Sequence, residues 1–456
     1  MAALIARLKG LASNDFIRSV GVLVGGTAAA QVLMAVSLPI ATRLYSPTDF
    51  SLLALFTAIV SIISVSACLR FDIAVPIPES DEEAANVLAL AVGFAVLVSA
   101  VLALLAIFAP GPIVRLLNRP DFQPYLWLVP LTVLLSGLFS TLQYWFVRRK
   151  SFRAIATTKM GQATGASATL VGLGFAHPTP LGLLLAYAIN SGAGFIGLSY
   201  RFLRTDVALL RQVSWQRMKH AFAANSRFPK YSTLEAACNS ASIYLPIILI
   251  SSLAAGPEAG YVIVAIQVMQ APMSLIGSAI AQVYLSRAPE EFRADNLGAF
   301  TASIFSGLLK TGVGPLIFGG IVAPEVFSLV FGQGWRPAGE LVLWMTPWFV
   351  AQFLSSPLSM ALHVTGNQRL ALCLQIFGLI VRAGSIYAAY LVFPKYLSET
   401  YAISGFIFYS VYNYQIFRIT GTGLYSLFGS LIKNSIFLLF WISMAIILKV
   451  IFYMYW

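Results

Sequence analysis

Hydrophobic and polar positions along this chain of 456 residues alternate in long blocks rather than residue by residue. Clear apolar blocks are residues 20–42, 52–67, 87–109 and 431–456. Blocks of about 20 residues match the helical length that crosses a hydrocarbon layer of ~30 Å. A transmembrane barrel would instead need alternating segments of ~10 residues. The pattern therefore predicts an all-α polytopic membrane protein.

Breaks at proline, glycine and clustered charge divide the chain into twelve or thirteen transmembrane helices. The fifth and sixth are rich in Gly, Ser and Thr, a composition that suits close helix packing or gating. The thirteen candidate spans are residues 17–42, 51–74, 84–109, 125–147, 154–176, 181–200, 232–254, 258–286, 298–322, 338–363, 370–392, 400–418 and 431–455.

The amino-acid composition supports a membrane protein, and the distribution of charge predicts which side of the membrane each loop faces. Hydrophobic residues make up 59% of the chain, whereas charged residues make up only 10%. With the N-terminus inside, most of the 29 lysines and arginines fall in inner segments, as the positive-inside rule requires. The outer loops hold only Arg43, Arg115, Arg119, Arg336 and Lys395. The N-terminus is therefore predicted to be cytoplasmic, and the net charge of +12 reflects topology rather than nucleic-acid binding.

The two halves of the chain resemble each other. Pro47 corresponds to Pro257, and Trp127 in "LWLVP", which opens the fourth span, corresponds to Trp344 in "LWMTP", which opens the tenth. Six helices separate the corresponding elements, so the halves are parallel repeats, an arrangement that places a substrate path between two lobes. We expect an N-terminal lobe over residues 1–200, a basic cytoplasmic linker over 201–231, a C-terminal lobe over 232–420 and an additional helix over 421–456.

Residues 1–16 are either a short amphipathic helix on the inner surface or a frayed tail. The three cysteines fall in or beside apolar segments, which predicts free thiols rather than disulfides. The three histidines are isolated, and neither a P-loop nor a metal-binding motif is present. We therefore expect no metal, no cofactor and no enzymatic activity.

Ionisable residues deep in the spans are the candidates for function, since Lys or Arg there costs roughly 2.5–3.5 kcal/mol even on the lenient insertion scale. Lys310 and Arg382 lie midway along their spans, while the other cations lie near inner ends, where snorkelling to lipid phosphates is the alternative. A cationic cavity would suit an anionic substrate such as a lipid diphosphate headgroup. The proposed substrate-binding cations are Arg18, Arg70, Arg148, Arg227, Lys230, Lys310 and Arg382.

Acids and prolines complete the candidate set. Asp72 and Glu235 are possible coupling or ion-pairing carboxylates; Glu235 also fits a helix-start acid. In "VPIPESDEEAANV", Ser80 with Glu83 predicts a capping box before the third span. The residues predicted to form a gate or hinge are Pro39, Pro246 and Pro272, each within an apolar run.

Five stretches together resemble the polysaccharide (O-antigen) flippase family of the multidrug/oligosaccharidyl-lipid/polysaccharide (MOP) exporter superfamily. They are "TRLYSPTDFSLLALF", "LRFDIAVPIPESDEEAANVLAL", "RFPKYSTLEAACN", "APMSLIGSAIAQVYLSRAPE" and residues 330–369. The resemblance covers about residues 15–420. It implies two six-helix lobes around a cationic cavity and transport of undecaprenyl-diphosphate-linked oligosaccharide across the bacterial cytoplasmic (inner) membrane for O-antigen, exopolysaccharide or capsule synthesis. Implied partners are that lipid-linked substrate, membrane lipids and other polysaccharide-assembly membrane proteins.

Two alternatives remain open at this point. A cation-coupled multidrug exporter of the same superfamily would carry carboxylates deep in its helices, whereas the deep charges here are cations. A membrane glycan polymerase or ligase would need a large outer loop, and the outer loops here are short. Both alternatives are disfavoured, the enzyme more strongly.

Overall fold

The computed structural model describes residues 15–254 and 256–455, so the predicted amphipathic helix over residues 1–16 falls almost entirely outside the described residues. The described chain forms two compact units. The first unit consists of residues up to Tyr45 together with Phe56–Ser240, and the second of Ser46–Leu55 together with Ala241–Trp456. The domain boundaries expected from the sequence, with a linker over 201–231, stay a prediction.

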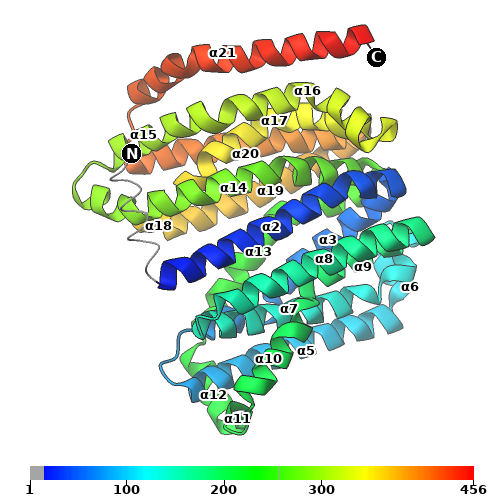
Figure 1. The fold of residues 1–456 in the computed structure, drawn as a ribbon, viewed down its shortest axis with the longest axis vertical. Helices are drawn as coiled ribbons and strands as arrows, with labels where there is room; N and C mark the ends of the chain where they lie inside the picture. Colours follow the sequence, from blue (N-terminus) through cyan, green and yellow to red (C-terminus); the bar gives the residue numbers. More distant parts are fainter. Residues whose placement is uncertain (1–14, 255, 456) are drawn as a thin grey trace. The chain divides into compact units, whose positions relative to one another are not determined.

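The first unit contains long helices that pack side by side, such as α2 on α8 and α5 on α7 (Figure 1). Its elements are α2 (Asp15–Leu44), the later part of α3 (Pro47–Ala67), α4 (Phe71–Ala74), α5 (Asp81–Phe108), α6 (Pro110–Leu116), η1 (Pro120–Tyr125), α7 (Leu128–Arg148), α8 (Phe152–Ala176), α9 (Pro180–Gly192), α10 (Gly194–Thr205), α11 (Val207–Leu210), α12 (Trp215–Ala224), η2 (Phe228–Ser232) and the start of α13 (Thr233–Leu253).

The second unit is also built from helices, with α17 packed against α14, α16 and α20. Its elements after α13 are α14 (Glu258–Arg293), α15 (Leu297–Leu308), η3 (Leu309–Val313), α16 (Gly314–Phe331), η4 (Gln333–Trp335), α17 (Arg336–Leu358), α18 (Ala361–Val364), α19 (Gln368–Val392), η5 (Pro394–Tyr396), α20 (Leu397–Thr420) and α21 (Leu424–Tyr455).

The structure confirms the all-α membrane fold predicted from the hydrophobic pattern. Ten helical segments within the described residues are long and apolar enough to cross a membrane. Each of the thirteen predicted spans corresponds to one helix or to consecutive helices: the sixth to α9 and α10, and the ninth to α15, η3 and α16. The predicted hinge prolines Pro39, Pro246 and Pro272 all lie inside helices, and the three cysteines are free.

The second predicted span, residues 51–74, is wrong at its C-terminal end. Helix α3 ends at Ala67, and the chain then turns through Leu69 and Arg70, whose φ angles of 47° and 61° are left-handed. Non-glycine residues rarely adopt this conformation. The spacing of apolar residues along the sequence therefore does not show that the helix ends here. Arg70 therefore precedes the separate short helix α4, to which Asp72 belongs.

Glycines at the junction of α9 and α10 allow these helices to approach α7. A Cβ atom added to Gly192 would lie 2.6 Å from the carbonyl carbon of Leu135 and 2.8 Å from the backbone nitrogen of Ser136. One added to Gly194 would lie 2.7 Å from the ring of Phe139. Of the two predicted uses of this Gly-rich segment, the structure thus supports close helix packing.

We predict that Gly192→Ala lowers the melting temperature of the purified protein. The added methyl group would clash with the backbone of α7, which cannot move aside as a flexible side chain can. Gly172→Ala on α8 is the matched control, since a Cβ atom there meets nothing within 4 Å. The control should be neutral or stabilising by up to about 1 kcal/mol, the helix-propensity difference between Ala and Gly. Equal melting curves for the two variants would show that α7 and α9 are not in close contact.

Candidate functional site

The loop over residues 75–80 connects α4 to α5 and ends in a helix cap. Pro76 and Pro78 cannot donate backbone hydrogen bonds and bias their predecessors away from helix. Ser80 is extended, and its hydroxyl accepts a hydrogen bond from the backbone N–H of Glu83 at 3.2 Å. This confirms the predicted cap, and Asp81, Glu82 and Glu83 complement the positive end of the α5 dipole.

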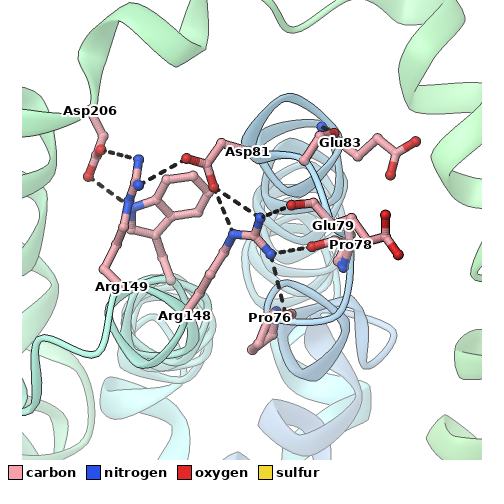
Figure 2. A network of polar contacts seen from close by, with 10 residues as sticks. Pro76, Pro78, Glu79, Asp81, Glu83, Arg148, Arg149 and Asp206 are labelled. Atoms are coloured by element: carbon pink, nitrogen blue, oxygen red, sulfur yellow. Dashed lines mark hydrogen bonds and ion pairs between the residues drawn. The ribbon is translucent and has the colours of Figure 1, made fainter.

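Arg148, the last residue of α7, holds this loop (Figure 2). Its Nε donates to Asp81 at 3.0 Å, and its Nη1 donates to the carbonyl oxygens of Pro76 and Pro78. Its Nη2 donates to the carbonyl oxygen of Glu79 at 3.1 Å. All three guanidinium nitrogens thus already have protein partners. A contact of Arg148 with substrate stays a prediction. The observed bonds show that this side chain holds the 75–80 loop in place.

Arg149 and Asp206 extend the same network, and sequence reasoning missed both. Arg149 pairs with Asp81 at 2.9 Å and with Asp206 at 2.6 Å, and its guanidinium lies 5.3 Å from the centre of the Trp145 ring. The indole N–H of Trp145 donates to Asp206 at 3.1 Å. Asp206 is the one acid in the basic sequence 201–231. A single acid among many cations could have been read as a sign of a structural ion pair.

Arg70 and Asp72 lie at the left-handed bend between α3 and α4. Asp72 is only 6% exposed, and Ser140 of α7 donates to its Oδ2 at 2.6 Å. The Oδ1 of Asp72 and the Nε of Arg70 are buried without a hydrogen-bond partner among the described residues. The bend therefore places a buried carboxylate beside a half-buried arginine whose Nε is buried, where the sequence suggested only a pair of nearby charges.

Two predicted cations lie on rare π-helical turns. Lys230 lies in η2, which contains Pro229, and Lys310 lies in η3, which ends just before Pro315. A proline removes one helical hydrogen bond and clashes with the carbonyl oxygen four residues earlier, so a widened turn relieves it. Lys230 and Lys310 are both exposed, as are Arg227 and Glu235 beside η2. Arg18 lies near the start of α2, and its side chain is outside the described residues.

Arg382, midway along α19, occupies the most distinctive environment of the seven predicted cations. It is 2% exposed, and its guanidinium carbon lies 4.3 Å from the ring centre of Phe408, 5.2 Å from that of Tyr409 and 5.6 Å from that of Trp348. Nη1 donates to the carbonyl oxygen of Ser242 at 3.3 Å. We call this guanidinium with the three rings the Arg382 site.

Unpartnered polar atoms belong to the Arg382 site and to two amides that lie one helical turn from Trp348 and Tyr409 on the same helices. Nε and Nη2 of Arg382 are buried without a hydrogen-bond partner, and no carboxylate of the described chain lies within ion-pairing distance of them. The indole N–H of Trp348 is also unpartnered, as are the amide oxygens of Gln352 on α17 and Asn413 on α20. Asn413 is held near Gln352, because its amide nitrogen donates to the carbonyl oxygen of Ala351 at 2.9 Å.

This arrangement can bind an anion but offers no metal chemistry. Cation–π contacts stabilise a guanidinium partly, yet they leave its N–H groups without acceptors, and a planar fork of N–H donors matches two oxygens of a phosphate or carboxylate. Among the residues that the structure describes, no group of three His, Cys, Asp or Glu side chains is placed to hold a metal ion.

The fold is similar to two solved transporters. The structure described as "Lipid II flippase MurJ, inward closed conformation" superposes with a TM-score of 0.72 at 12% identity, covering 94% of this chain and 97% of that one. A "multidrug resistance MATE family transporter of the MOP superfamily", in its inward-facing conformation, gives a TM-score of 0.58 at 14% identity, covering 86% and 96%. Identities this low show a shared fold.

The sequence itself matches a family model. No curated protein matches the chain. The model described as "Polysaccharide biosynthesis protein" matches residues 40–340, which is more than half of the chain. The fold is similar to that of these two solved transporters, and the chain belongs to the polysaccharide biosynthesis protein family.

Proposed function

We propose that this protein flips undecaprenyl-diphosphate-linked oligosaccharide repeat units from the inner to the outer leaflet of the bacterial cytoplasmic membrane, by alternating access. Family membership supports a role in polysaccharide synthesis. The fold supports a transporter, because it is similar to that of a lipid II flippase. The observation that carries the substrate assignment is the buried, incompletely bonded Arg382.

The Arg382 site favours an anion with two oxygens, such as a diphosphate. An unsatisfied buried donor costs about 1–3 kcal/mol, and Nε and Nη2 of Arg382 are two such donors. A phosphate that accepts from both would offset this cost and form the strong bidentate geometry of guanidinium and phosphate. Because Arg382 is almost inaccessible here, the diphosphate reaches it only after the ring of Trp348 or Tyr409 moves.

The neighbouring amides suit the sugar that follows the diphosphate. The free amide oxygens of Gln352 and Asn413 are acceptors for hydroxyl groups, and the ring of Trp348 offers a flat apolar face and an N–H donor. A lipid without sugars would leave these groups unpartnered. The combination therefore favours a glycosylated diphosphate over a simple anionic lipid.

Three of the other predicted cations are exposed. Arg227, Lys230 and Lys310 add positive charge that attracts an anionic headgroup by about 1 kcal/mol each near a membrane surface. Both π-helical turns carry one of these lysines, and single π turns recur at functional sites. In this proposal the N-terminus and the basic 201–231 segment are cytoplasmic, and Pro39, Pro246 and Pro272 are the points at which helices bend between states.

We predict that Arg382→Ala abolishes surface glycan export, and that Arg382→Lys weakens substrate binding about tenfold to a hundredfold, because losing charge-assisted bonds costs about 1.5–3 kcal/mol. The measurement is complementation of a deletion strain, with surface glycan and cytoplasmic-leaflet lipid-linked repeat units quantified. Lys395→Ala, an exposed lysine in η5, is the control and should behave as wild type.

The protein level and melting temperature of each Arg382 variant separate loss of binding from loss of folding. Arg382→Ala leaves a cavity among three rings and lowers stability, so Arg382→Met, which fills most of the volume without the charge, is the second variant and should abolish export while accumulating normally. Wild-type glycan in that variant would exclude the proposed role of Arg382. Unchanged lipid-linked pools together with drug sensitivity in the deletion strain would instead support the multidrug-exporter alternative.

Arg148 is expected to behave in the opposite way. Arg148→Ala removes the bonds to the 75–80 loop and to Asp81, so we predict destabilisation of about 1–3 kcal/mol, the cost of leaving carbonyl oxygens without a hydrogen-bond donor. The matched control is Arg153→Ala, an exposed arginine in the first turn of α8. Differential scanning fluorimetry measures both. Loss of export at an unchanged melting temperature would favour the substrate contact predicted for Arg148 from the sequence.

A further inference from the structure

A groove of about 440 Å³ lies between α5 and α12 within the first unit. Its two walls are helical stripes with the same spacing, so each wall is one continuous helix face. The α5 wall consists of Leu90, Gly93, Phe94 and Leu97, and the α12 wall consists of Trp215, Met218, Lys219 and Phe222. We call this space the α5–α12 groove.

Polar bonds on the opposite side of α12 fix the width of the groove. The backbone N–H of Ser214, the N-cap of α12, donates to the side-chain oxygen of Asn86 at 3.2 Å, and Asn86 is 1% exposed. Arg217 pairs with Glu82 at 3.1 Å. Since Asn86 and Glu82 both belong to the first turns of α5, the groove is a built feature and not a gap between loosely placed helices.

The floor of the groove is open and its inner end is closed. A Cβ atom added to Gly93 would meet nothing within 4 Å, so no packing contact requires a glycine there. At the inner end the ring of Phe222 lies 6.2 Å from that of Phe94 and 5.5 Å from that of the fully buried Phe71. The groove therefore has room for a narrow ligand beside Gly93 and is closed at one end by three aromatic rings.

The chemistry of the walls excludes water and favours a hydrocarbon chain. Seven of the eight lining residues are apolar or glycine, whereas a buried water needs two to four polar partners. Leu90 lies nine residues into α5, about 14 Å along the helix from its start at 1.5 Å per residue, within a segment that is long and apolar enough to cross a membrane. Lys219 supplies one cation at the groove, with its ammonium 5.5 Å from the centre of the Trp215 ring.

We propose that the α5–α12 groove binds one acyl chain of an anionic phospholipid of the inner leaflet, and that Lys219 binds its phosphate. A lysine whose stem lies on apolar surface while its ammonium reaches the headgroup level is the usual arrangement at this boundary. An aromatic indole such as that of Trp215 favours the same boundary. Anionic lipids are the natural partner of basic segments beside the inner membrane surface, and α12 belongs to the basic 201–231 segment.

Lipid binding here would support the bend that carries Arg70 and Asp72. The occupant contacts Phe94 and Phe222, whose rings pack on Phe71, and Phe71 is the residue between Arg70 and Asp72. An empty groove leaves Phe222, 38% exposed, free to move away from Phe71. The site therefore links the lipid composition of the inner leaflet to the geometry of a buried charged bend.

Native mass spectrometry of the delipidated full-length protein, titrated with palmitoyl-oleoyl phosphatidylglycerol or phosphatidylethanolamine, tests this. Gly93→Leu should weaken binding of both lipids about tenfold or more, since each methylene kept out of the groove weakens binding roughly fourfold. Gly172→Leu, at another open helical glycine, should bind as wild type. Lys219→Ala should weaken phosphatidylglycerol selectively, by about fivefold, and Lys395→Ala should not.

A phosphatidylglycerol with a diazirine on its acyl chain provides a second measurement that needs no groove-filling variant. In wild-type protein its cross-links should fall on peptides of α5 and α12. Cross-links elsewhere, or unchanged lipid affinity in a folded Gly93→Leu variant, would overturn the proposal. Displacement of the probe from these peptides by undecaprenyl phosphate at lower concentration would also overturn it, by assigning the groove to a polyprenyl chain. Neither measurement depends on transport, so the outcome is separate from the proposed function.

Discussion

The structure depends on one constraint: a polar group away from water must find its partner within the protein. The 75–80 loop meets it through Arg148, whose fork of donors binds the carbonyl oxygens that Pro76 and Pro78 leave outside any helix. Asp81 and Asp206 neutralise Arg148 and Arg149 in turn. The Arg148–Arg149 network is thus completed within the protein, whereas the buried Nε and Nη2 of Arg382 in the second unit have no partner among the described residues. Under the proposed function, the substrate supplies the missing acceptors.

Hydrophobic block length was enough to predict the membrane helices, because the hydrocarbon layer sets a length that every span must meet. It failed where a backbone conformation, not hydropathy, ends the helix: Leu69 and Arg70 turn left-handed inside an apolar sequence. The hydrophobic pattern also did not predict the π-helical turns at Lys230 and Lys310. The sequence signal for each turn is a nearby proline, Pro229 or Pro315. Cap chemistry at Ser80 was predictable, because it depends on neighbours within one turn.

Charge type and depth separated Arg382 and Lys310 from Arg148 in the sequence, but they could not show which of these cations already have partners within the protein. Arg148 and Arg382 differ in partners that are far away in sequence. Asp81 is 67 residues from Arg148, and Ser242 is 140 residues from Arg382. No local pattern carries such information. Sequence reasoning also grouped Arg227 and Lys230 with these residues, whereas their exposure suits attraction of an anion rather than its final binding.

Phe71 connects the bend at Arg70 and Asp72 to the α5–α12 groove. Its ring is fully buried between Phe94 and Phe222, and its backbone joins Arg70 to Asp72, so the bend cannot unwind without moving that ring out of an apolar cluster. Burying an aromatic ring contributes a few kcal/mol, comparable to the strain of the two left-handed residues that precede it. The rings of Phe94 and Phe222 therefore hold the bend, and whatever fills the groove beside them acts on the position of the two charges.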